Sequence, residues 1–494
     1  MKDLKQKTIR SGLAKLCSQS ADFVLRIASL VIMARLLEPK DFGLIAMVTA
    51  VTGFYGLFTS AGLSAATIQA PTVSNEQLST LFWINIAVGA VLALLCVLTA
   101  PVIVRFYHEP RLFWVTVAVA AGFIINAATV QHSALLQRQL RYVTLAVIET
   151  LSQLVSFTVG IVMALKGFGY WALVGTAITT PACFIVCLWA VTQWIPDLPR
   201  RSVGIGAMLR FGGTLTLNSV VVYIAYNLEK VLLGRFWGAD VLGIYGRAYQ
   251  LINVPTDNLN SAVGGVTFSA LSRLQNDPAR FRSYFLKAYA LVNSLTLPIT
   301  LFSALFGDLI ISVCLGPKWM AAVPIFRLLA PTVMVFGIIN PLGWLLLALG
   351  LYGRSFQIAR VIAPLVITAY LIGLPYGPTG VAMAYSSAMA LWLVPHILWC
   401  TYRTVISPRD VLSILSKPLV SALVAAAFAF LVQRYIGELL SPLPRLLLTA
   451  VTMGVTYVLM LLFVMGQNAL YLDILNGIRS SPRLDVTEAE GRSV

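Results

Sequence analysis

Charged residues are scarce in this chain. Asp, Glu, Lys and Arg together make up 11% of its 494 residues, whereas a soluble domain usually carries about 25%. A water-facing shell around a chain of this length could not be built from so few. The hydrophobic residues, at 59%, recur instead in stretches of about 20, each long enough to cross the ~30 Å hydrocarbon layer of a bilayer. The composition therefore excludes a soluble fold and predicts an all-α polytopic membrane protein.

Metal-binding and catalytic patterns are also missing from the sequence. The three histidines are scattered, so their spacing identifies no metal site. The six cysteines fall in or beside apolar stretches, where we interpret them as small apolar side chains. No paired carboxylates, Gly-rich phosphate loop or nucleophile constellation appears, and no connection is long enough to form an extramembrane catalytic domain. The sequence thus predicts no metal, no cofactor and no enzyme.

The formal net charge is +16. The 35 Lys and Arg residues punctuate the gaps between apolar stretches, and no basic run alternates with aromatic residues as a nucleic-acid site would require. We therefore expect no nucleic-acid partner. The positive charge is better explained by the tendency of cytoplasmic segments of membrane proteins to carry more Lys and Arg.

The apolar stretches predict fourteen transmembrane helices joined by short connections. Their expected ranges are 12–36, 42–68, 79–104, 112–134, 142–165, 168–194, 207–233, 241–271, 284–314, 321–349, 355–374, 378–401, 412–435 and 445–469. With the N-terminus placed inside, the cytoplasmic segments hold 22 of the Lys and Arg residues and the outer segments hold 11, while Arg26 and Lys230 lie within helices. This bias predicts that both termini are cytoplasmic.

An internal repeat relates the two halves of the chain. The segment 34–44 resembles the segment 200 positions later, with matches between Arg35 and Arg235 and between Gly43 and Gly243. Each copy holds six helices, an even number, so both copies enter the membrane from the same side. The repeat therefore predicts two parallel six-helix lobes around a central cavity, plus two extra C-terminal helices. The expected divisions are an N-lobe at 1–200, a C-lobe at 201–405, the extra spans at 406–475 and a cytoplasmic tail at 476–494.

The residues of this repeat resemble those of a known family. The segment 34–44, Ala-Arg-Leu-Leu-Glu-Pro-Lys-Asp-Phe-Gly-Leu, and the segment 227–235, followed by 242–245, are similar to signatures of bacterial polysaccharide flippases. These proteins form the polysaccharide-transport branch of the multidrug/oligosaccharidyl-lipid/polysaccharide exporter superfamily, and the similarity is nearest to the colanic-acid type. The sequence departs from the pattern at Glu229, where many relatives carry Asp.

This resemblance implies a substrate and a direction of transport. The substrate would be an oligosaccharide repeat unit on undecaprenyl diphosphate, flipped from the cytoplasmic to the periplasmic leaflet of a bacterial inner membrane for exopolysaccharide, capsule or O-antigen synthesis. Other implied partners are membrane lipids, a driving ion (H⁺ or Na⁺) and a polysaccharide polymerase or export machinery. A multidrug/cation antiporter or a peptidoglycan-precursor flippase stays open on the same fold, and a membrane glycan polymerase or glycosyltransferase is an alternative of another class.

Two helices carry polar residues that suit an anionic headgroup, which cannot cross hydrocarbon unaided. In the first span, Asp22 precedes Arg26 by one turn, the favourable order for an ion pair. Arg26 is either a diphosphate ligand held by Asp22 or one half of a structural pair. The seventh span offers a carboxylate for coupling, Glu229, which together with its neighbour could instead reach the membrane interface. The substrate-binding candidates of the seventh span are Asn218, Tyr223, Asn227 and Lys230.

The eighth and fifth spans carry further polar stripes. Asn253, Asp257 and Asn260 follow a helical spacing in the eighth, and Glu149 begins a similar stripe in the fifth. These stripes either face water and sugar hydroxyls or join packed helices by hydrogen bonds. Asp257 and Glu149 are also candidates for proton coupling, because burial favours the uncharged carboxyl. Three cations near cytoplasmic helix ends are candidate entrance residues, or ordinary positive flanks: Arg210, Arg360 and Lys417.

Overall fold

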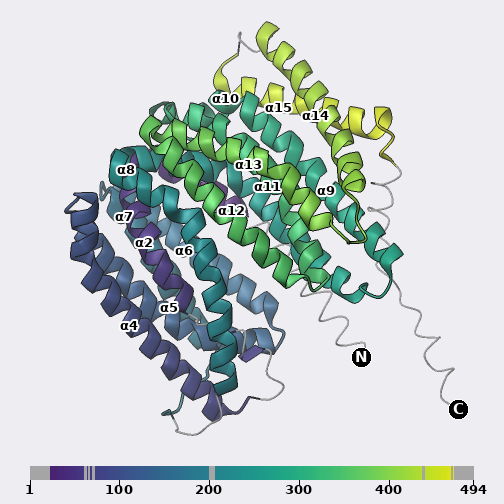
Figure 1. The fold of residues 1–494 in the computed structure, drawn as a ribbon. Coiled ribbons are helices and arrows are strands. Elements are labelled where there is room, and N and C mark those ends of the chain that lie inside the picture. Colours follow the sequence, from purple (N-terminus) through teal and green to yellow (C-terminus); the bar gives the residue numbers. More distant parts are fainter. Residues whose placement is uncertain are drawn as a thin grey trace, which may run out of the picture. The chain divides into compact units, whose positions relative to one another are not determined.

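The fold is that of a computed structural model, drawn in Figure 1. It describes residues 23–59, 64, 67–68, 73–199, 206–436, 440–468 and 471, and within 206–225 it describes the side chain of Tyr223 alone. Asp22 and the side chains of Arg210 and Asn218 lie outside this description. The roles assigned to those three residues stay predictions.

All regular structure in the described residues is helical, which confirms the predicted all-α class. Residues 23–36 form the first described helix. The helices that follow are α2 (Pro39–Thr59), α4 (Asn75–Tyr107), α5 (Leu112–Arg138), α6 (Tyr142–Leu165), α7 (Tyr170–Thr192), α8 (Gly206–Arg273), α9 (Pro278–Leu305), α10 (Gly307–Cys314), α11 (Ala322–Ala348), α12 (Tyr352–Gly373), α13 (Gly377–Thr401), α14 (Pro408–Tyr435) and α15 (Pro442–Leu459). Short 3₁₀ turns lie at Pro317–Trp319 and Leu374–Tyr376, and a π turn at Met460–Val464 extends α15.

Each of the fourteen predicted spans contains helix, but two boundaries differ from the prediction. The seventh and eighth spans form one continuous element, α8, interrupted by the single non-helical residue Gly238 at φ 84° and ψ 179°. Glycine takes this positive φ at little steric cost, so the two spans meet at a kink. The ninth span, expected at 284–314, is split into α9 and α10 at Phe306, whose φ of −107° ends α9. Hydropathy is continuous across that break and could not predict it.

The helices have the length and composition of membrane spans. In the described part of the chain, ten stretches are long and apolar enough to cross a bilayer, and one of them, Tyr352–Thr401, contains both α12 and α13. Large apolar side chains such as Leu98 and Leu391 are exposed on these helices, where lipid replaces water as the solvent. The chain is a multi-pass membrane protein.

Several helices begin at residues that the sequence marks as caps. The Ser74 side chain accepts a hydrogen bond from the backbone N–H of Gln77, and the Ser74 N–H donates one to Gln77 Oε1. The same reciprocal pair, formed by Ser407 and Asp410, opens α14. These bonds satisfy N–H groups that have no partner in the first turn of a helix, and they set where α4 and α14 start.

The chain divides into two compact units. One unit contains the residues up to Ala262 together with Ile310–Val333 and Phe356–Trp392, and the other contains Val263–Leu309, Met334–Ser355 and the residues from Leu393 onward. The first unit combines segments from both halves of the sequence, whereas every segment of the second unit comes from the second half. The division into lobes at 1–200 and 201–405, with extra spans at 406–475, stays a prediction.

In the first unit, α4 packs along α5, and α6 packs along α7 (Figure 1). Buried apolar side chains join each pair: Cys96 and Phe123 lie in the α4–α5 cluster, while Ile148 and Leu188 belong to a cluster shared by α5, α6 and α7. Between membrane helices this packing stabilises each pair through close van der Waals contact, because lipid is as apolar as the side chains themselves. These contacts hold the helices that border the cavities described below.

In the second unit, α14 packs against α9 and α15. A row of buried alanines on α14, including Ala422 and Ala429, lets the helix backbones approach closely. The Tyr457 hydroxyl of α15 donates a hydrogen bond of 2.6 Å to the Ser294 carbonyl of α9, away from solvent. The last two spans are therefore fixed to the body of this unit by packing and by a buried polar contact.

The first helical turn of α2 (Pro39–Gly43) and the first helical turn of α8 after its kink (239–243) are related by the repeat, and they interlock within the first unit. A Cβ atom added to Gly43 would lie 1.7 Å from the carbonyl oxygen of Ala239, and one added to Gly243 would lie 1.9 Å from the carbonyl oxygen of Pro39. Ala239 is the residue 200 positions after Pro39, so the two contacts are reciprocal. The repeat seen in the sequence is therefore expressed as an approximate two-fold contact between the turns, and only glycine fits it.

The matching arginines of the repeat also occupy related positions. Arg35 donates hydrogen bonds to the carbonyls of Val313 and Cys314, at the end of α10. Arg235 donates to His108 Nδ1 at 2.9 Å, beyond the end of α4. Each arginine thus binds residues at or just beyond the end of the third span of the opposite half. Under the predicted topology, all of these contacts lie on the outer side of the membrane.

Candidate functional site

The first unit contains a partly open cavity of about 490 Å³, which we call the main cavity. Its walls come from α2, α7 and α8. The α8 helix lines the cavity on both sides of the Gly238 kink, with Lys230 before it and Arg247 after it. The polar and charged residues that line the cavity are Thr49, Thr176, Glu229, Lys230, Tyr245, Arg247, Tyr249, Gln250, Asn253 and Asp257.

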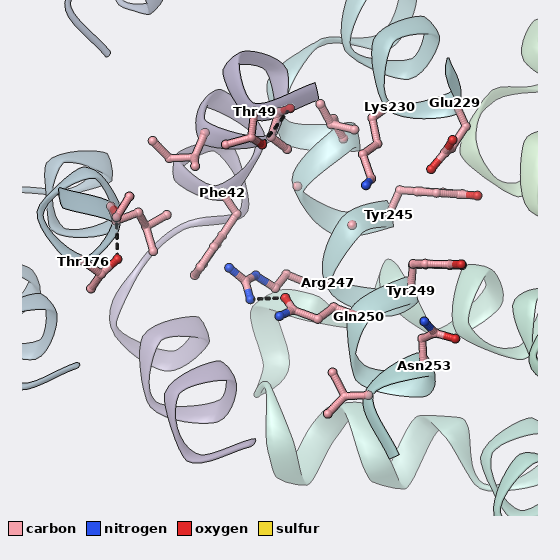
Figure 2. Close-up of a pocket in the computed structure, with 18 of the residues that line it drawn as sticks. Phe42, Thr49, Thr176, Glu229, Lys230, Tyr245, Arg247, Tyr249, Gln250 and Asn253 are labelled. Carbon is pink, nitrogen blue, oxygen red and sulfur yellow. Dashed lines mark hydrogen bonds between the residues drawn. The ribbon is translucent and has the colours of Figure 1, made fainter. Parts of the chain in front are cut away.

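Arg247 is held against an aromatic ring. Its guanidinium carbon lies 3.8 Å from the centroid of the Phe42 ring on α2, a distance typical of a cation–π contact. Its Nη1 donates to Gln250 Oε1, one turn further along α8. Figure 2 shows the guanidinium beside the Phe42 ring, with its bond to Gln250. These contacts fix the plane of the guanidinium while the other N–H groups stay available to a ligand.

Lys230 belongs to a short chain of hydrogen bonds. Its ammonium donates to Asn227 Oδ1 at 2.8 Å, and Asn227 Nδ2 donates to the Tyr223 carbonyl at 3.0 Å. The Tyr223 hydroxyl in turn donates to the carbonyls of Thr49 and Ala50 on α2 at 3.2 Å. Tyr223, Asn227 and Lys230 follow one another at helical spacings of four and three residues, and the structure joins them through these hydrogen bonds. Their binding role stays a prediction.

Only part of the polar stripe of the eighth span faces the main cavity. Asn253 Nδ2 donates to Asp257 Oδ2, and both residues line the main cavity. Asn260 is buried, donates to the Thr256 carbonyl at 3.0 Å and does not line the cavity. Glu149 lies outside the lining of both cavities described here, although it interacts with other residues. Asn253 and Asp257 are thus the members of these stripes that can meet a ligand.

A smaller cavity of about 270 Å³ adjoins the main cavity. Arg26 and Ser29 from the first described helix line it, facing Gln153 and Ser156 of α6 and Thr180 of α7. Four residues line both cavities: Thr176, Ala177, Arg247 and Gln250. The two cavities therefore meet at the Arg247 side chain.

The joined cavities carry more positive than negative charge. Arg26, Lys230 and Arg247 contribute three cations, while Glu229 and Asp257 contribute two carboxyl groups. Asp257 lies within electrostatic reach of Arg26. No group of three His, Cys, Asp or Glu side chains suited to a metal ion occurs among the residues that the structure describes. The chemistry of this site is that of cationic, hydroxyl and amide groups inside membrane helices.

The two predicted entrance residues whose side chains are described, Arg360 and Lys417, do not line either cavity. Arg360 is exposed on α12, with its guanidinium carbon 5.9 Å from the Phe356 ring centroid. Lys417 lies on α14 in the other unit. Their proposed role at an entrance stays a prediction.

Sequence reasoning missed Arg247. The count of Lys and Arg placed it with the outer segments, because it follows closely after the turn at 234–244. A signal was available in the helical spacing of Arg247, Gln250, Val254 and Asp257, since positions three and four apart share a face. Phe42 was also missed as a site residue, and nothing in the sequence indicates which cation it would contact.

Comparison with known proteins gives a family match over most of the cavity-forming region. Residues 32–324 match a family model described as "Polysaccharide biosynthesis protein". That range contains α2 through α10 and covers more than half of the chain.

Several characterised proteins are similar in sequence. The teichuronic acid biosynthesis protein TuaB of Bacillus subtilis is 30% identical over 307 residues, 62% of this chain and 64% of that protein. The lipopolysaccharide biosynthesis protein WzxC of Escherichia coli is 26% identical over 75% of this chain and 76% of that protein. The succinoglycan biosynthesis transport protein ExoT of Rhizobium meliloti is 23% identical over 85% of both chains. The match therefore spans just under two thirds of the Bacillus protein and more of the other two.

Solved structures show the same fold. An inward closed conformation of the lipid II flippase MurJ superposes with a TM-score of 0.74 at 15% identity, covering 94% of this chain and all of the other. An inward-facing transporter of the multidrug resistance MATE family superposes with a TM-score of 0.60 at 13% identity, covering 82% of this chain and 99% of the other. At these identities the likeness extends to the fold alone.

Proposed function

The chain belongs to the polysaccharide biosynthesis protein family, and from this membership we propose that it is a flippase for a lipid-linked oligosaccharide. Its substrate is an oligosaccharide on undecaprenyl diphosphate, which it moves from the cytoplasmic to the periplasmic leaflet of a bacterial inner membrane. It does so without making or breaking a covalent bond. The related proteins named for teichuronic acid, lipopolysaccharide and succinoglycan biosynthesis support this substrate class.

The observation that best supports the proposal is that three cationic side chains line the two adjoining cavities. Arg26, Lys230 and Arg247 reach this space from membrane helices, where an isolated charge is costly and usually functional. A diphosphate would offset that cost by ionic hydrogen bonds, which are roughly twice as strong as neutral ones. The planar Arg247 guanidinium can bind two phosphate oxygens at once, and its place between the cavities suits the diphosphate link between lipid and sugar.

Polar groups around the cations suit the sugar. Gln250 and Asn253 border the main cavity, and Gln153, Ser156 and Thr180 border the smaller one. Their amide and hydroxyl groups both donate and accept hydrogen bonds, as sugar hydroxyls do. The diphosphate therefore lies at Arg247, the sugars lie along these residues, and the polyprenyl chain stays in lipid.

Transport proceeds by alternating access of the site to the two sides of the membrane. The interlocked turns at Pro39–Gly43 and Ala239–Gly243 close the outer side, given that both termini are cytoplasmic. The substrate then enters from the cytoplasmic leaflet and leaves when the turns separate. An ion gradient drives the cycle, since flipping must continue against accumulated product.

Reconstitution of the full chain tests this function. In liposomes that contain a fluorescent undecaprenyl-diphosphate oligosaccharide, flipping moves the sugar out of reach of an impermeant glycosidase. We expect Arg247→Ala to lower the flipping rate at least about tenfold, equivalent to ~1.4 kcal/mol. Arg280→Ala is the matched control: this arginine has a side chain 80% exposed and pairs only with Asp277 one turn away, a contact of little energetic weight.

A different cargo would give a different result. The cationic cavities should repel organic cations, so liposomes should not accumulate a fluorescent cationic drug. Uptake of the cation with no movement of the lipid-linked sugar would replace the flippase proposal by a drug antiporter. Flipping of a lipid-linked peptidoglycan precursor in preference to the oligosaccharide would change the substrate assignment.

A further inference from the structure

One end of the second unit is rich in arginine. A hydrogen bond from Gln275 Nε2 to the Ala348 carbonyl joins the residues that follow α8 to the end of α11. Arg282 pairs with Asp410 and so joins α9 to α14 at the same end. Because α9 and α12 begin within a few residues of the ends of α8 and α11, these contacts gather several helix ends together. The arginines of the described segments at this end are Arg273, Arg280, Arg282, Arg354, Arg403 and Arg409.

Carboxyl groups compensate only part of this positive charge. Two carboxylates lie at this end among the described residues, and each is already paired: Asp277 with Arg280 at 3.4 Å, and Asp410 with Arg282 at 2.6 Å. Within the part of the chain that the structure describes, neither Arg354 nor Arg403 pairs with a carboxylate. Unpaired charges of one sign repel one another, so an anion bound at this end would stabilise it.

Two of these arginines lie around one aromatic ring. The guanidinium carbon of Arg354 lies 5.9 Å from the centroid of the Tyr402 ring, and that of Arg403 lies 5.2 Å from it. Both distances are those of a cation–π contact. Arg354 Nη1 also donates to the Tyr402 carbonyl at 2.6 Å, which joins the start of α12 to the end of α13. We call Arg354, Tyr402 and Arg403 the arginine clamp, because they hold two positive groups close to a single ring.

Ending a helix does not by itself account for the clamp. Arg403 has a φ of 51°, in the left-handed region where glycine is favoured and where helices usually end with glycine. An arginine there adopts a strained backbone that a glycine would avoid. Arg354 does satisfy a carbonyl at the end of α13, but this bond uses one of its five N–H groups. The other N–H groups of Arg354 are available to a ligand.

An apolar strip leads from the clamp along α13. Val394 and Leu398 precede Tyr402 at intervals of four residues, so the three side chains share one face of the helix. Their exposed fractions are 61%, 53% and 57%. At 1.5 Å per residue the strip is about 12 Å long, and a tyrosine at its end is typical of the boundary between hydrocarbon and headgroups. The clamp therefore lies at headgroup level, beside apolar surface that suits an acyl chain.

We propose that the arginine clamp binds the phosphate of an anionic phospholipid, whose acyl chains lie along Val394 and Leu398. A guanidinium can bind two phosphate oxygens at once, and a negative headgroup offsets the charge that carboxylates leave uncompensated. The diphosphate of a lipid-linked substrate offers similar chemistry, but it is present only during transport, whereas the charge of the clamp needs a partner at all times. The clamp also lines neither of the two cavities described above. Under the predicted topology it faces the cytoplasmic leaflet.

Lipid binding to the purified full chain tests this site. Native mass spectrometry in a neutral detergent measures how much phosphatidylglycerol, which has a net negative charge, and phosphatidylcholine, which has none, stays bound to the protein. We expect phosphatidylglycerol to bind at least about tenfold more tightly, because only its headgroup offsets the charge of the clamp. Equal binding of the two lipids would overturn the proposal.

Matched double variants locate the binding. Arg354→Gln combined with Arg403→Gln should lower the affinity for phosphatidylglycerol at least about tenfold, since both guanidinium groups are lost. Arg273→Gln combined with Arg409→Gln removes the same charge from the same end of the unit and should change the affinity much less. Equal losses in the two double variants would mean that the lipid is attracted by the charged surface as a whole, which contradicts a site at the clamp.

The single variant Arg403→Gly separates lipid binding from folding. Glycine favours the backbone conformation at this position, so thermal unfolding should not begin at a lower temperature. The affinity for phosphatidylglycerol should nevertheless fall, by about threefold or more, because one guanidinium is gone. This variant also serves if the double variant at the clamp does not fold. An unchanged affinity in Arg403→Gly would remove Arg403 from the site.

Competition between lipids identifies the source of the phosphate. Undecaprenyl diphosphate, added in an amount equal to the phosphatidylglycerol, should leave the phospholipid bound at the clamp. Displacement of the phospholipid would make the clamp a substrate site and would overturn its assignment to a phospholipid. None of these measurements requires transport. Lipid binding at the clamp can therefore be confirmed even if no lipid-linked sugar is flipped, and flipping without selective lipid binding would refute this inference alone.

Discussion

Gly43 and Gly243 lie 200 positions apart in the chain, and the Cα of each contacts the backbone of the helical turn that carries the other. The nearest atoms are backbone carbonyl oxygens, of Ala239 and Pro39 respectively. Backbone cannot move aside as a flexible side chain can. The two turns can therefore close only while both positions are glycine, which makes this contact a sensitive point of the transport cycle.

We expect Gly43→Ala to prevent full closure of the turns. The added methyl group would overlap the Ala239 carbonyl oxygen at 1.7 Å, and overpacking of this kind costs about 1–3 kcal/mol. The measurement is disulfide formation between Lys40→Cys and Asp240→Cys, which should become at least about fivefold slower. Gly56→Ala is the control, because Gly56 also lies in α2 and has nothing within 4 Å of an added Cβ. Equal slowing by both substitutions would contradict the interpretation.

Arg247→Lys keeps the charge and removes the planar group. A lysine cannot bind two phosphate oxygens in the fork geometry of a guanidinium, and it is a compact, strongly hydrated charge. We expect flipping to fall about 10- to 100-fold, with the protein still inserted and folded. Phe42→Leu should give a smaller loss, about threefold, because it removes the ring beneath the guanidinium and leaves the guanidinium itself. Full activity in Arg247→Lys would mean that only the charge matters there.

The sequence predicted the helices of the fold better than the kinks and breaks between them. Helical spans follow from apolar length, and the match between Gly43 and Gly243 was visible as a repeat. The contact that the two glycines make with each other's turns was not predicted. The kink at Gly238 and the break at Phe306 depend on single backbone dihedral angles, for which hydropathy has no signal. Prediction therefore succeeded where many residues act together and failed where one residue decides.

The candidate site was predicted in part for the same reason. Tyr223, Asn227 and Lys230 share a helical face, so periodicity alone could group them, and their hydrogen bonds join them as that face requires. Arg247 acquires its place from a contact with Phe42, more than two hundred residues away in the chain. Such a contact cannot be read from one sequence, and neither can the choice of Asn253 over Asn260 as a cavity residue.

Arg26→Ala should abolish glycan export in cells. Arg26 lines the smaller cavity and is exposed to it, so its loss removes one of three cations available to the diphosphate. The assay is surface polysaccharide in a strain whose only copy carries the substitution, with membrane insertion checked by immunoblot. Undiminished polysaccharide would remove Arg26 from the binding site. Ser29→Ala, one turn away in the same cavity lining, should reduce export much less.

Tyr457→Phe should destabilise the second unit. The hydroxyl donates to the Ser294 carbonyl in a buried position, and a buried carbonyl left without its donor costs about 1–3 kcal/mol. Thermal unfolding in detergent should therefore begin at a lower temperature. Tyr376→Phe removes the same atom from a residue that is 76% exposed and should leave the transition unchanged. Transport should be affected only through the amount of folded protein.

The direction of transport depends on which side the turns face, and labelling of single cysteines decides it. The excess of Lys and Arg in alternate segments places Arg403 in the cytoplasm and the exposed Glu38, beside the interlocked turns, outside. In intact cells an impermeant maleimide should label Glu38→Cys and should label Arg403→Cys only after the membrane is opened. The reverse pattern would place the closed turns on the cytoplasmic side. The cavities would then open outward in this conformation, and the proposed path from the cytoplasmic to the periplasmic leaflet would have to begin from another state.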